Sequence, residues 1–210
     1  MSTHTHYAPS LEENRIDLGS RDEAYFSFLL DKISDLLKLL KLENFIDIEI
    51  EVSNGKTENL TCNRRRKVRT LAGFFKPFIS MEPNVKGYKN EEFKIIKILD
   101  ANINGRILGV IWSFPCHPTN LFNSKLISAE FPGEIRSSIR EKQNFSGLSV
   151  IYMPGFAGDV RAYPPKRRSF LKLIRTLLQL SYPVKYYRFI NKEEYNIWVH
   201  SLTNSFWNRE

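Results

Sequence analysis

Three of the four histidines in this chain lie in short polar segments of the kind found at strand ends. His4 and His6 fall in the first ten residues, and His117 lies between two prolines in the segment Pro115-Cys116-His117-Pro118-Thr119. Neutral imidazole is the commonest protein ligand for zinc. Because these histidines are scarce and lie in polar turns rather than on helix faces, they predict one metal site built from distant parts of the sequence.

The individual histidines differ in how strongly they indicate a metal site. His4 and His6 are two residues apart, and on an extended segment this spacing puts both imidazoles on one side. One could bind a metal ion while the other orients water or substrate, although a pair so near a chain start is also compatible with disorder. His117 follows an apolar strand, where it is either a ligand or an ordinary turn residue. His200 falls among apolar residues of a predicted helix and is interpreted as a helix-face residue.

Two further segments could complete a site. The glycine turn from Gly155 through Asp159 to Val160 could present backbone N–H groups to an anion or a developing oxyanion. The alternative is a tight strand-to-helix turn that needs glycine for positive φ. Arg64 could place its planar guanidinium beside a carboxylate or oxyanion, or could belong to a charged surface. There is no serine-hydrolase elbow, P-loop or dinucleotide fingerprint in the sequence.

Composition limits the class of protein. The chain has 210 residues, 42% hydrophobic and 13% aromatic, which fits one folded domain rather than a disordered segment. The formal net charge of +8 comes from clusters at 64–69 and 166–168, which are typical of either anion binding or a solvated face. Cys62 and Cys116 are too few for a disulfide framework, which favours the cytoplasm. No apolar run is long enough to cross a membrane.

Local patterns predict the elements. Ser20 and Glu23 form a capping box before an amphipathic helix that reaches about residue 41. Residues 45–52 alternate as a strand with one wet face, which Asn54-Gly55 ends, and residues 53–90 are expected to form a long loop. Strands 93–99 and 106–114 flank Asn104-Gly105, a strong hairpin signal. The remaining expectations are helices at 132–142, 168–180 and 192–207, and a buried strand at 148–153.

Helices interleaved with strands, together with the hairpin, indicate an α/β layered single domain with a mixed β-sheet flanked by helices. The candidate segments follow strands, and open α/β sheets place their sites at such strand ends. We therefore expect the histidines to converge at one edge of the sheet.

Four of these segments, in this order, resemble the neutral/alkaline ceramidase family of zinc hydrolases and its bacterial relatives. Ser2-Thr3-His4-Thr5-His6 with Pro9 resembles that family's Thr-His-Thr-His-Ser-Gly-Pro, and Asn63-Arg64-Arg65 resembles its Asn-Arg-Arg. The segment around His117, followed by Ile-Ser-Ala-Glu-Phe-Pro-Gly at 127–133, resembles Ala-Cys-His-Pro-Thr and Ile-Ser-Ala-Asp-Phe-Pro-Gly. Ala-Gly-Asp-Val at 157–160 is shared as it stands.

The resemblance implies Zn²⁺ as cofactor and amide hydrolysis as reaction. It implies His4 and His117 as zinc ligands, His6 and Arg64 as catalytic residues that contact substrate or attacking water, and Gly155 and Asp159 as substrate-binding residues. Ceramidases proper carry serine where this chain has Gly155. The family completes its metal site with a downstream glutamate and tyrosine, and neither is assigned here. We therefore expect residues 1–210 to form an incomplete ceramidase-like catalytic domain.

The expected substrate is a small-molecule or lipid N-acyl amide. Peripheral membrane contact would be compatible with such a substrate, and no nucleic-acid partner is expected because no recognition motif accompanies the basic clusters. Two alternatives stay open: a non-catalytic remnant that keeps the α/β core, and a basic module that binds nucleic acid or anionic lipid.

Overall fold

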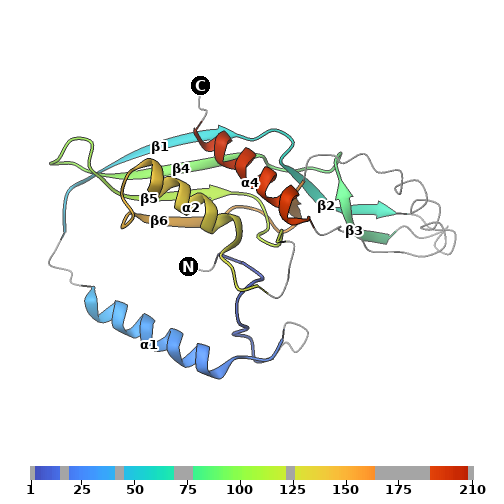
Figure 1. Ribbon diagram of the computed structural model, residues 1–210, viewed down its shortest axis with the longest axis horizontal. Helices are drawn as coiled ribbons and strands as arrows, with labels where there is room; N and C mark the ends of the chain where they lie inside the picture. Colours follow the sequence, from blue (N-terminus) through green and yellow to red (C-terminus); the bar gives the residue numbers. More distant parts are fainter. Residues whose placement is uncertain are drawn as a thin grey trace.

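A computed structural model describes residues 3–14, 19–40, 45–68, 78–121, 126–163 and 190–207. A four-stranded sheet forms the centre, a three-stranded sheet adjoins one end of it, and helices α2 and α4 lie across one face of the larger sheet (Figure 1). Helix α1 lies apart from this body at the bottom of the view.

The larger sheet has the strand order β1-β4-β5-β6. Its strands are β1 (Ile48–Lys56), β4 (Glu92–Asp100), β5 (Ile107–Phe114) and β6 (Ser149–Pro154). The β1–β4 and β4–β5 pairs are antiparallel, whereas β5 and β6 run parallel. The predicted mixed α/β sheet is therefore confirmed.

The predicted hairpin joins β4 and β5. Gly105 has a φ of +75°, in the left-handed region that glycine adopts at little cost, and the backbone N–H of Asp100 donates to the Arg106 carbonyl across the turn. A parallel partner needs a long crossover, and the connection from β5 to β6 contains α2 (Glu130–Lys142). The predicted helices at 132–142 and 192–207 are confirmed as α2 and α4 (Lys192–Trp207).

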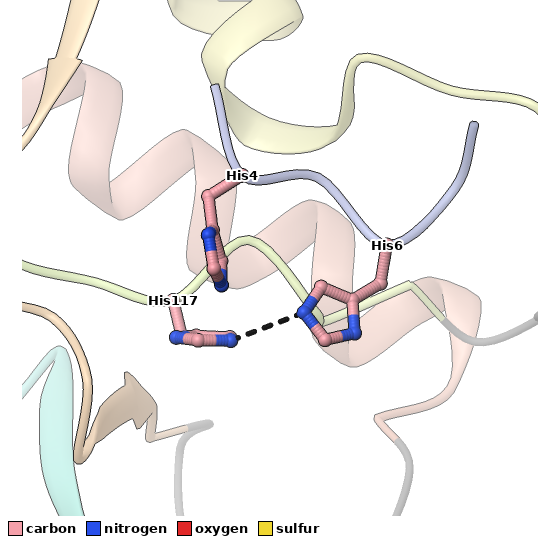
Figure 2. A group of neighbouring side chains, drawn as sticks. All are labelled: His4, His6 and His117. Atoms are coloured by element: carbon pink, nitrogen blue, oxygen red, sulfur yellow. Dashed lines mark hydrogen bonds between the residues drawn. The ribbon is translucent and has the colours of Figure 1, made fainter. Parts of the chain in front are cut away.

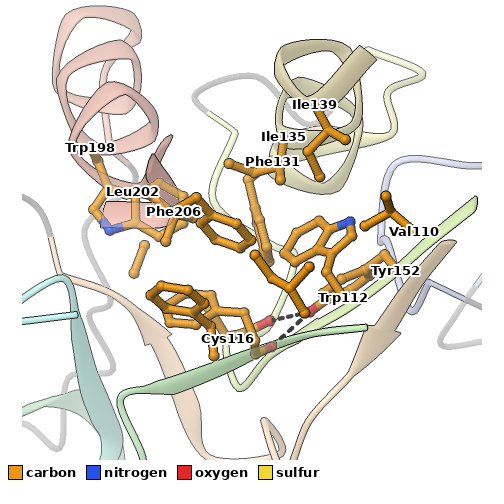
Figure 3. Packing of buried hydrophobic residues seen from close by; sticks show 14 of the residues in the cluster. Val110, Trp112, Cys116, Phe131, Ile135, Ile139, Tyr152, Trp198, Leu202 and Phe206 are labelled. Carbon is orange, nitrogen blue, oxygen red and sulfur yellow. Dashed lines mark hydrogen bonds between the residues drawn. The ribbon is translucent and has the colours of Figure 1, made fainter. Parts of the chain in front are cut away.

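The core lies between the sheet and these two helices (Figure 3). Alternate residues of β4, β5 and β6 point toward α2 and α4, and the rings of Trp112 and Phe206 meet edge to face with centroids 5.1 Å apart. Phe131 at the start of α2 lies edge to face with Trp198 of α4. The core fixes the end of β5, because the Tyr152 hydroxyl donates to the carbonyls of Phe114 and Cys116.

The smaller sheet corrects the expectation of a long loop at 53–90. Strand β1 continues through Asn54-Gly55, and Gly55 leaves room for an aromatic ring, because a Cβ there would lie 2.0 Å from a carbon of Phe93. Beyond it, β2 (Thr61–Val68) pairs antiparallel with β3 (Phe78–Asn84) and with β7 (Val160–Ala162). The cationic run at 64–67 therefore belongs to a central strand.

Helix α1 (Glu23–Leu39) differs from the sequence prediction in its cap and its packing. Asp22, not Ser20, caps the helix by accepting from the Tyr25 backbone N–H. No α1 residue is buried, and most of its apolar side chains are exposed. The apolar side of β1 is exposed as well, at Ile48, Ile50 and Val52. The prediction that only the acidic side of this strand is wet is therefore wrong for residues 48–52, which are exposed on both faces among the described residues, whereas Ser53 and Gly55 are half-buried.

Some expectations lie outside the described residues, namely the helix at 168–180 and the basic cluster at 166–168. Of the helices that the structure describes, none is both long and apolar enough to span a bilayer.

Candidate metal centre

His117 occupies a buried loop directly after β5. Its backbone N–H donates to the Val160 carbonyl at 2.9 Å, which joins the loop to β7. Cys116 beside it is fully buried in the core, and His117 itself is only 6% exposed. Both Cys62 and Cys116 are free thiols. The buried backbone of the loop therefore positions the His117 side chain without help from a ligand.

The ring of His117 is oriented by one backbone carbonyl. Its Nδ1 lies 3.3 Å from the Ala157 oxygen, and because a carbonyl can only accept, Nδ1 carries the proton. The Nε2 lone pair then points away from the core, toward His6 Nε2 at 3.3 Å (Figure 2). This is the arrangement that ligating histidines use to fix their tautomer.

Hydrogen bonds and one buried ring hold the N-terminal segment. Thr5 Oγ1 donates to the Ser128 carbonyl at 3.1 Å, and the Ser128 N–H donates to the Tyr7 carbonyl at 2.9 Å. The Tyr7 ring is 6% exposed and packs with Leu121 and Tyr195, and its hydroxyl donates to the Leu121 carbonyl. Residues more than a hundred positions apart are thereby brought side by side.

His4 closes the cluster through an unusual backbone conformation. Its φ is +59°, so the segment turns at His4 and is not the regular extended stretch that the sequence predicts. The His4 and His117 ring centroids are 4.6 Å apart, and those of His6 and His117 are 5.1 Å apart. One ligand atom from each histidine lies within 4.8 Å of the others. The structure brings the three histidines together, while their roles as ligands stay predictions.

The surroundings of His6 and His117 favour their neutral form. Partial burial is the main cause of a lowered pKa at His6, and the neighbouring His4 and the cation of Arg64 add to it. Burial, followed by the Arg64 cation, lowers the pKa of His117 to about 4. A neutral imidazole has the lone pair that a metal ion requires. His6 and His117 are therefore in their metal-binding form at neutral pH.

Arg64 is held beside the histidines by the glycine turn. Its Nε and NH2 donate to the Gly158 carbonyl at 3.1 and 2.8 Å, and its backbone N–H donates to the Asp159 carbonyl at 2.7 Å. The Asp159 carboxylate accepts from the Asn63 side chain at 2.8 Å. The turn therefore binds Arg64 through the Gly158 carbonyl, and the Asp159 carboxylate binds the Asn63 side chain of β2.

The glycine turn differs from both sequence interpretations in its backbone. It joins β6 to β7 instead of leading into a helix, and positive φ is found at neither Gly155 nor Gly158. Gly155 permits a close approach instead, since a Cβ there would lie 3.2 Å from atoms of Pro115. The turn therefore lies directly against the loop that carries His117.

Sequence reasoning missed two residues that support the loop. Asn120 is 1% exposed; its Nδ2 donates to the His117 carbonyl at 2.8 Å and its Oδ1 accepts from the Ala162 N–H. The Asn120 backbone N–H donates to the carboxyl of Glu130, which is 2% exposed. Burial raises the pKa of Glu130 to about 8. The only sequence signal was the position of Glu130 inside the segment 127–133.

The donor chemistry of the cluster is of the kind that metal ions such as zinc bind. Zinc binds imidazole nitrogen at about 2.0–2.1 Å in tetrahedral geometry, which separates two ligand nitrogens by roughly 3.3 Å. The His6–His117 separation is 3.3 Å, and the ligand atoms of all three histidines lie within 4.8 Å of one another. The fold is thus a mixed α/β sheet with a histidine cluster at one end that could hold a metal ion.

This fold is ceramidase-like. The crystal structure of neutral ceramidase from Pseudomonas aeruginosa is similar, with a TM-score of 0.55 and 17% identity over 98% of this chain and 28% of that chain. A second structure, a ceramidase complexed with C2, gives a TM-score of 0.51 and 22% identity over 76% of this chain and 24% of that one. The chain therefore spans about a quarter of these neighbours. No family model and no curated protein matches the sequence.

Proposed function

We propose that this chain is a ceramidase-like, zinc-dependent amide hydrolase domain that acts on an N-acyl amide. The observation that carries the proposal is the convergence of His4, His6 and His117 at one end of the sheet in a ceramidase-like fold.

In this proposal His4 and His117 supply imidazole ligands, and His6 lies within reach of the same ion. Bound zinc lowers the pKa of a coordinated water and polarises a carbonyl. The chain's own contribution is position and charge. Ala157 fixes the His117 tautomer, and the Gly158 carbonyl holds the Arg64 cation where it lowers the pKa of both His6 and His117.

Arg64 supplies the second element of the chemistry. During amide hydrolysis the carbonyl oxygen gains negative charge, and a fixed cation that needs no reorganisation stabilises that charge. Two Arg64 N–H donors are oriented by one carbonyl, so the guanidinium is positioned before substrate arrives. We assign Arg64 to the oxyanion and the turn at Gly155 and Asp159 to the substrate side of the site.

The proposed substrate class is a lipid or other N-acyl amide. Its support is the ceramidase-like fold together with the histidine cluster. Because ceramidases proper carry serine at the position of Gly155, we propose an amide other than ceramide as the preferred substrate. Pro115 lies 3.2 Å from where a Gly155 side chain would begin, so a serine would also press on the loop that carries His117.

The test combines metal content with turnover. Purified protein should contain zinc by elemental analysis and should hydrolyse a fluorogenic N-acyl amide, with activity lost to a chelator and restored by zinc. His117→Ala should lose both properties. His200→Ala is the matched control, because His200 is exposed on α4 beside Asn204. Equally negligible zinc in wild type and His117→Ala would contradict the proposal, and so would zinc-loaded protein without turnover on any N-acyl chain length.

A further inference from the structure

The two halves of strand β2 differ sharply in burial. Residues 61–63 are buried and pair with β7, whereas Arg65 and Lys67 are exposed. From Arg65 onward, β2 pairs with β3, which gives a two-stranded ribbon at the right-hand end of the molecule (Figure 1). The strand that holds Arg64 beside the histidines therefore continues into an exposed cationic end.

One face of this ribbon combines cations with aliphatic side chains. Residues directly opposite each other on antiparallel strands have side chains on the same face, and successive residues of a strand alternate between faces. Arg65 lies opposite Met81, and Lys67 lies opposite Ile79. Ile79 is 65% exposed and Met81 is 38% exposed. Two cations and two aliphatic side chains therefore share one exposed surface, called here the ribbon face.

The charge of the ribbon face is complementary to an anionic surface. Among the described residues, no ion pair involves Arg65 or Lys67. The formal net charge of the whole chain is +8, so its long-range attraction acts in the same direction. The partner of this face should therefore carry negative charge.

The aliphatic side chains distinguish between anionic partners. Proteins that bind single-stranded nucleic acid without reading its sequence stack the bases on aromatic rings, and Ile79 and Met81 carry none. At a membrane, apolar side chains enter the boundary between headgroups and acyl chains, while Lys and Arg meet the anionic headgroups. We therefore infer that the ribbon face docks on an anionic lipid surface.

Two exposed aromatic residues lie in turns that contact β2 beside Arg64. Phe156 is 97% exposed in the glycine turn, whose Gly158 carbonyl binds Arg64. Tyr88 is 88% exposed, and its carbonyl accepts from the Asn63 side chain. Aromatic side chains are enriched at membrane–water interfaces. These turns therefore extend the same surface chemistry from the ribbon toward the candidate site.

Docking of the ribbon face would bring a lipid substrate close to the candidate site. Lys67 lies three residues beyond Arg64 on β2, which is roughly 10 Å at the rise of a strand. An acyl chain partitions into a bilayer, so a hydrolase docked there meets a lipid amide where it is concentrated. The inference thus deepens the proposed function, on which its purpose rests, by naming an anionic membrane as the source of the substrate.

Vesicle binding of the full chain tests the inference, and it should be the same in zinc and in chelator because docking needs no metal. The protein should cosediment with vesicles of phosphatidylcholine and phosphatidylserine, more weakly as salt rises, and far less with phosphatidylcholine alone. Arg65→Gln combined with Lys67→Gln should lower the partition coefficient about 25-fold, since each basic residue near such a surface contributes about fivefold.

The aliphatic contribution has its own variant and the charge change its own control. Ile79→Thr keeps a β-branched residue in the strand and should lower vesicle binding about fivefold, at high salt as well as low. Lys32→Gln combined with Lys38→Gln removes the same charge from exposed positions on α1. That pair should change binding by less than about twofold, because charges away from the docked face are screened. Thermal unfolding should be unchanged in all these variants.

The outcomes separate docking from the proposed function. No binding to anionic vesicles at low salt, or a loss in the α1 pair as large as in the β2 pair, would overturn the inference. Tighter binding to a DNA or RNA oligonucleotide through the same two cations would overturn it too and assign the ribbon face to nucleic acid. The lipid and salt comparison on wild type does not depend on how any variant folds. Wild type that docks but holds no zinc would overturn the proposed function alone.

Discussion

The two parts of the chain that meet at the histidine cluster are held to very different degrees. The loop that carries His117 is buried, and both its backbone and the Asn120 side chain make internal hydrogen bonds. The segment that carries His4 and His6 leaves both imidazoles exposed, and its backbone bond from His6 to the Pro118 carbonyl is 3.5 Å long.

The difference indicates that the site has two halves. The core positions the half that carries His117, called here the preformed half. A more loosely held N-terminal segment brings in His4 and His6, called here the delivered half. The core fixes His117 whether or not a ligand is present. The N-terminal segment depends on the Tyr7 ring and on a few hydrogen bonds around Ser128, so under the proposed function part of the free energy of zinc binding would be spent in ordering it. Substitutions in the two parts should therefore affect zinc affinity and global stability in different proportions.

The largest effect should come from removing the preformed ligand. His117→Ala deletes the one imidazole that the core positions, so zinc affinity should fall by well over about 100-fold, more than for loss of an outer partner. Global stability without metal should change little, because no aromatic core contact is lost. Chelator competition and thermal unfolding in chelator measure the two quantities. A zinc affinity within threefold of wild type would contradict the comparison.

Asn120→Ala should damage the preformed half without touching a ligand. It removes one of the two donors to the His117 carbonyl, which keeps the Thr119 N–H, and it removes the side-chain acceptor of the Ala162 N–H. Each lost hydrogen bond is worth about 0.5–1.5 kcal/mol, so the free energy of unfolding should fall by about 1–3 kcal/mol, and zinc affinity by about 10–100-fold. Urea denaturation with and without zinc separates the effects, and Asn204→Ala on α4 is the exposed control.

Tyr7→Ala should loosen only the delivered half. It removes a buried ring that packs with Leu121 and Tyr195. Because residues 3–9 can detach without opening the core, the metal-free unfolding free energy should fall by less than about 1 kcal/mol, well under the usual cost of deleting a core aromatic ring. Zinc affinity should fall about tenfold, because the metal must then order the segment alone. A loss of global stability equal to that of Asn120→Ala would show that both halves belong to one cooperative unit.

Elements with local signals were predictable from sequence. Asn104-Gly105 marks the hairpin, with Gly105 at positive φ in the loop between Asp100 and Ile107, and helices α2 and α4 follow from apolar periodicity, with a proline near the start of α2. Strand β2 was missed, because its run of cations at 64–67 has no alternation. That strand exists through its pairing with β3 and β7, which is information from distant segments.

The candidate site shows the same division. Scarcity and placement of the histidines predicted that they would meet, and they do. The burial of Glu130 was missed because its contact with the Asn120 N–H joins the loop to the start of α2. The bond from Asn120 to the His117 carbonyl spans only three residues, but an asparagine after a proline-rich turn does not by itself indicate which carbonyl it binds. The exposed apolar faces of α1 and β1 were predicted to be buried, since periodicity reports which side is apolar but not whether a partner covers it.

Zinc affinity should change least, by under about threefold, in Glu130→Gln, whereas the pH dependence of metal-free stability should change clearly. The pKa of Glu130 is raised by burial from 4.5 to about 8, so its contribution is complete below pH 4.5 and is lost as the pH rises through 8. The pKa of His117 is lowered from 6.5 to about 4, so its contribution to stability is complete above pH 6.5 and is lost as the pH falls toward 4.

Urea denaturation in chelator from pH 4 to 9 should therefore show a loss of stability at both ends of this pH range. Glu130→Gln should remove the alkaline loss and keep the acid loss, while His117→Ala should do the reverse. An alkaline loss that persists in Glu130→Gln would mean that another group beneath the loop titrates there, and that the preformed half does not depend on a protonated carboxyl.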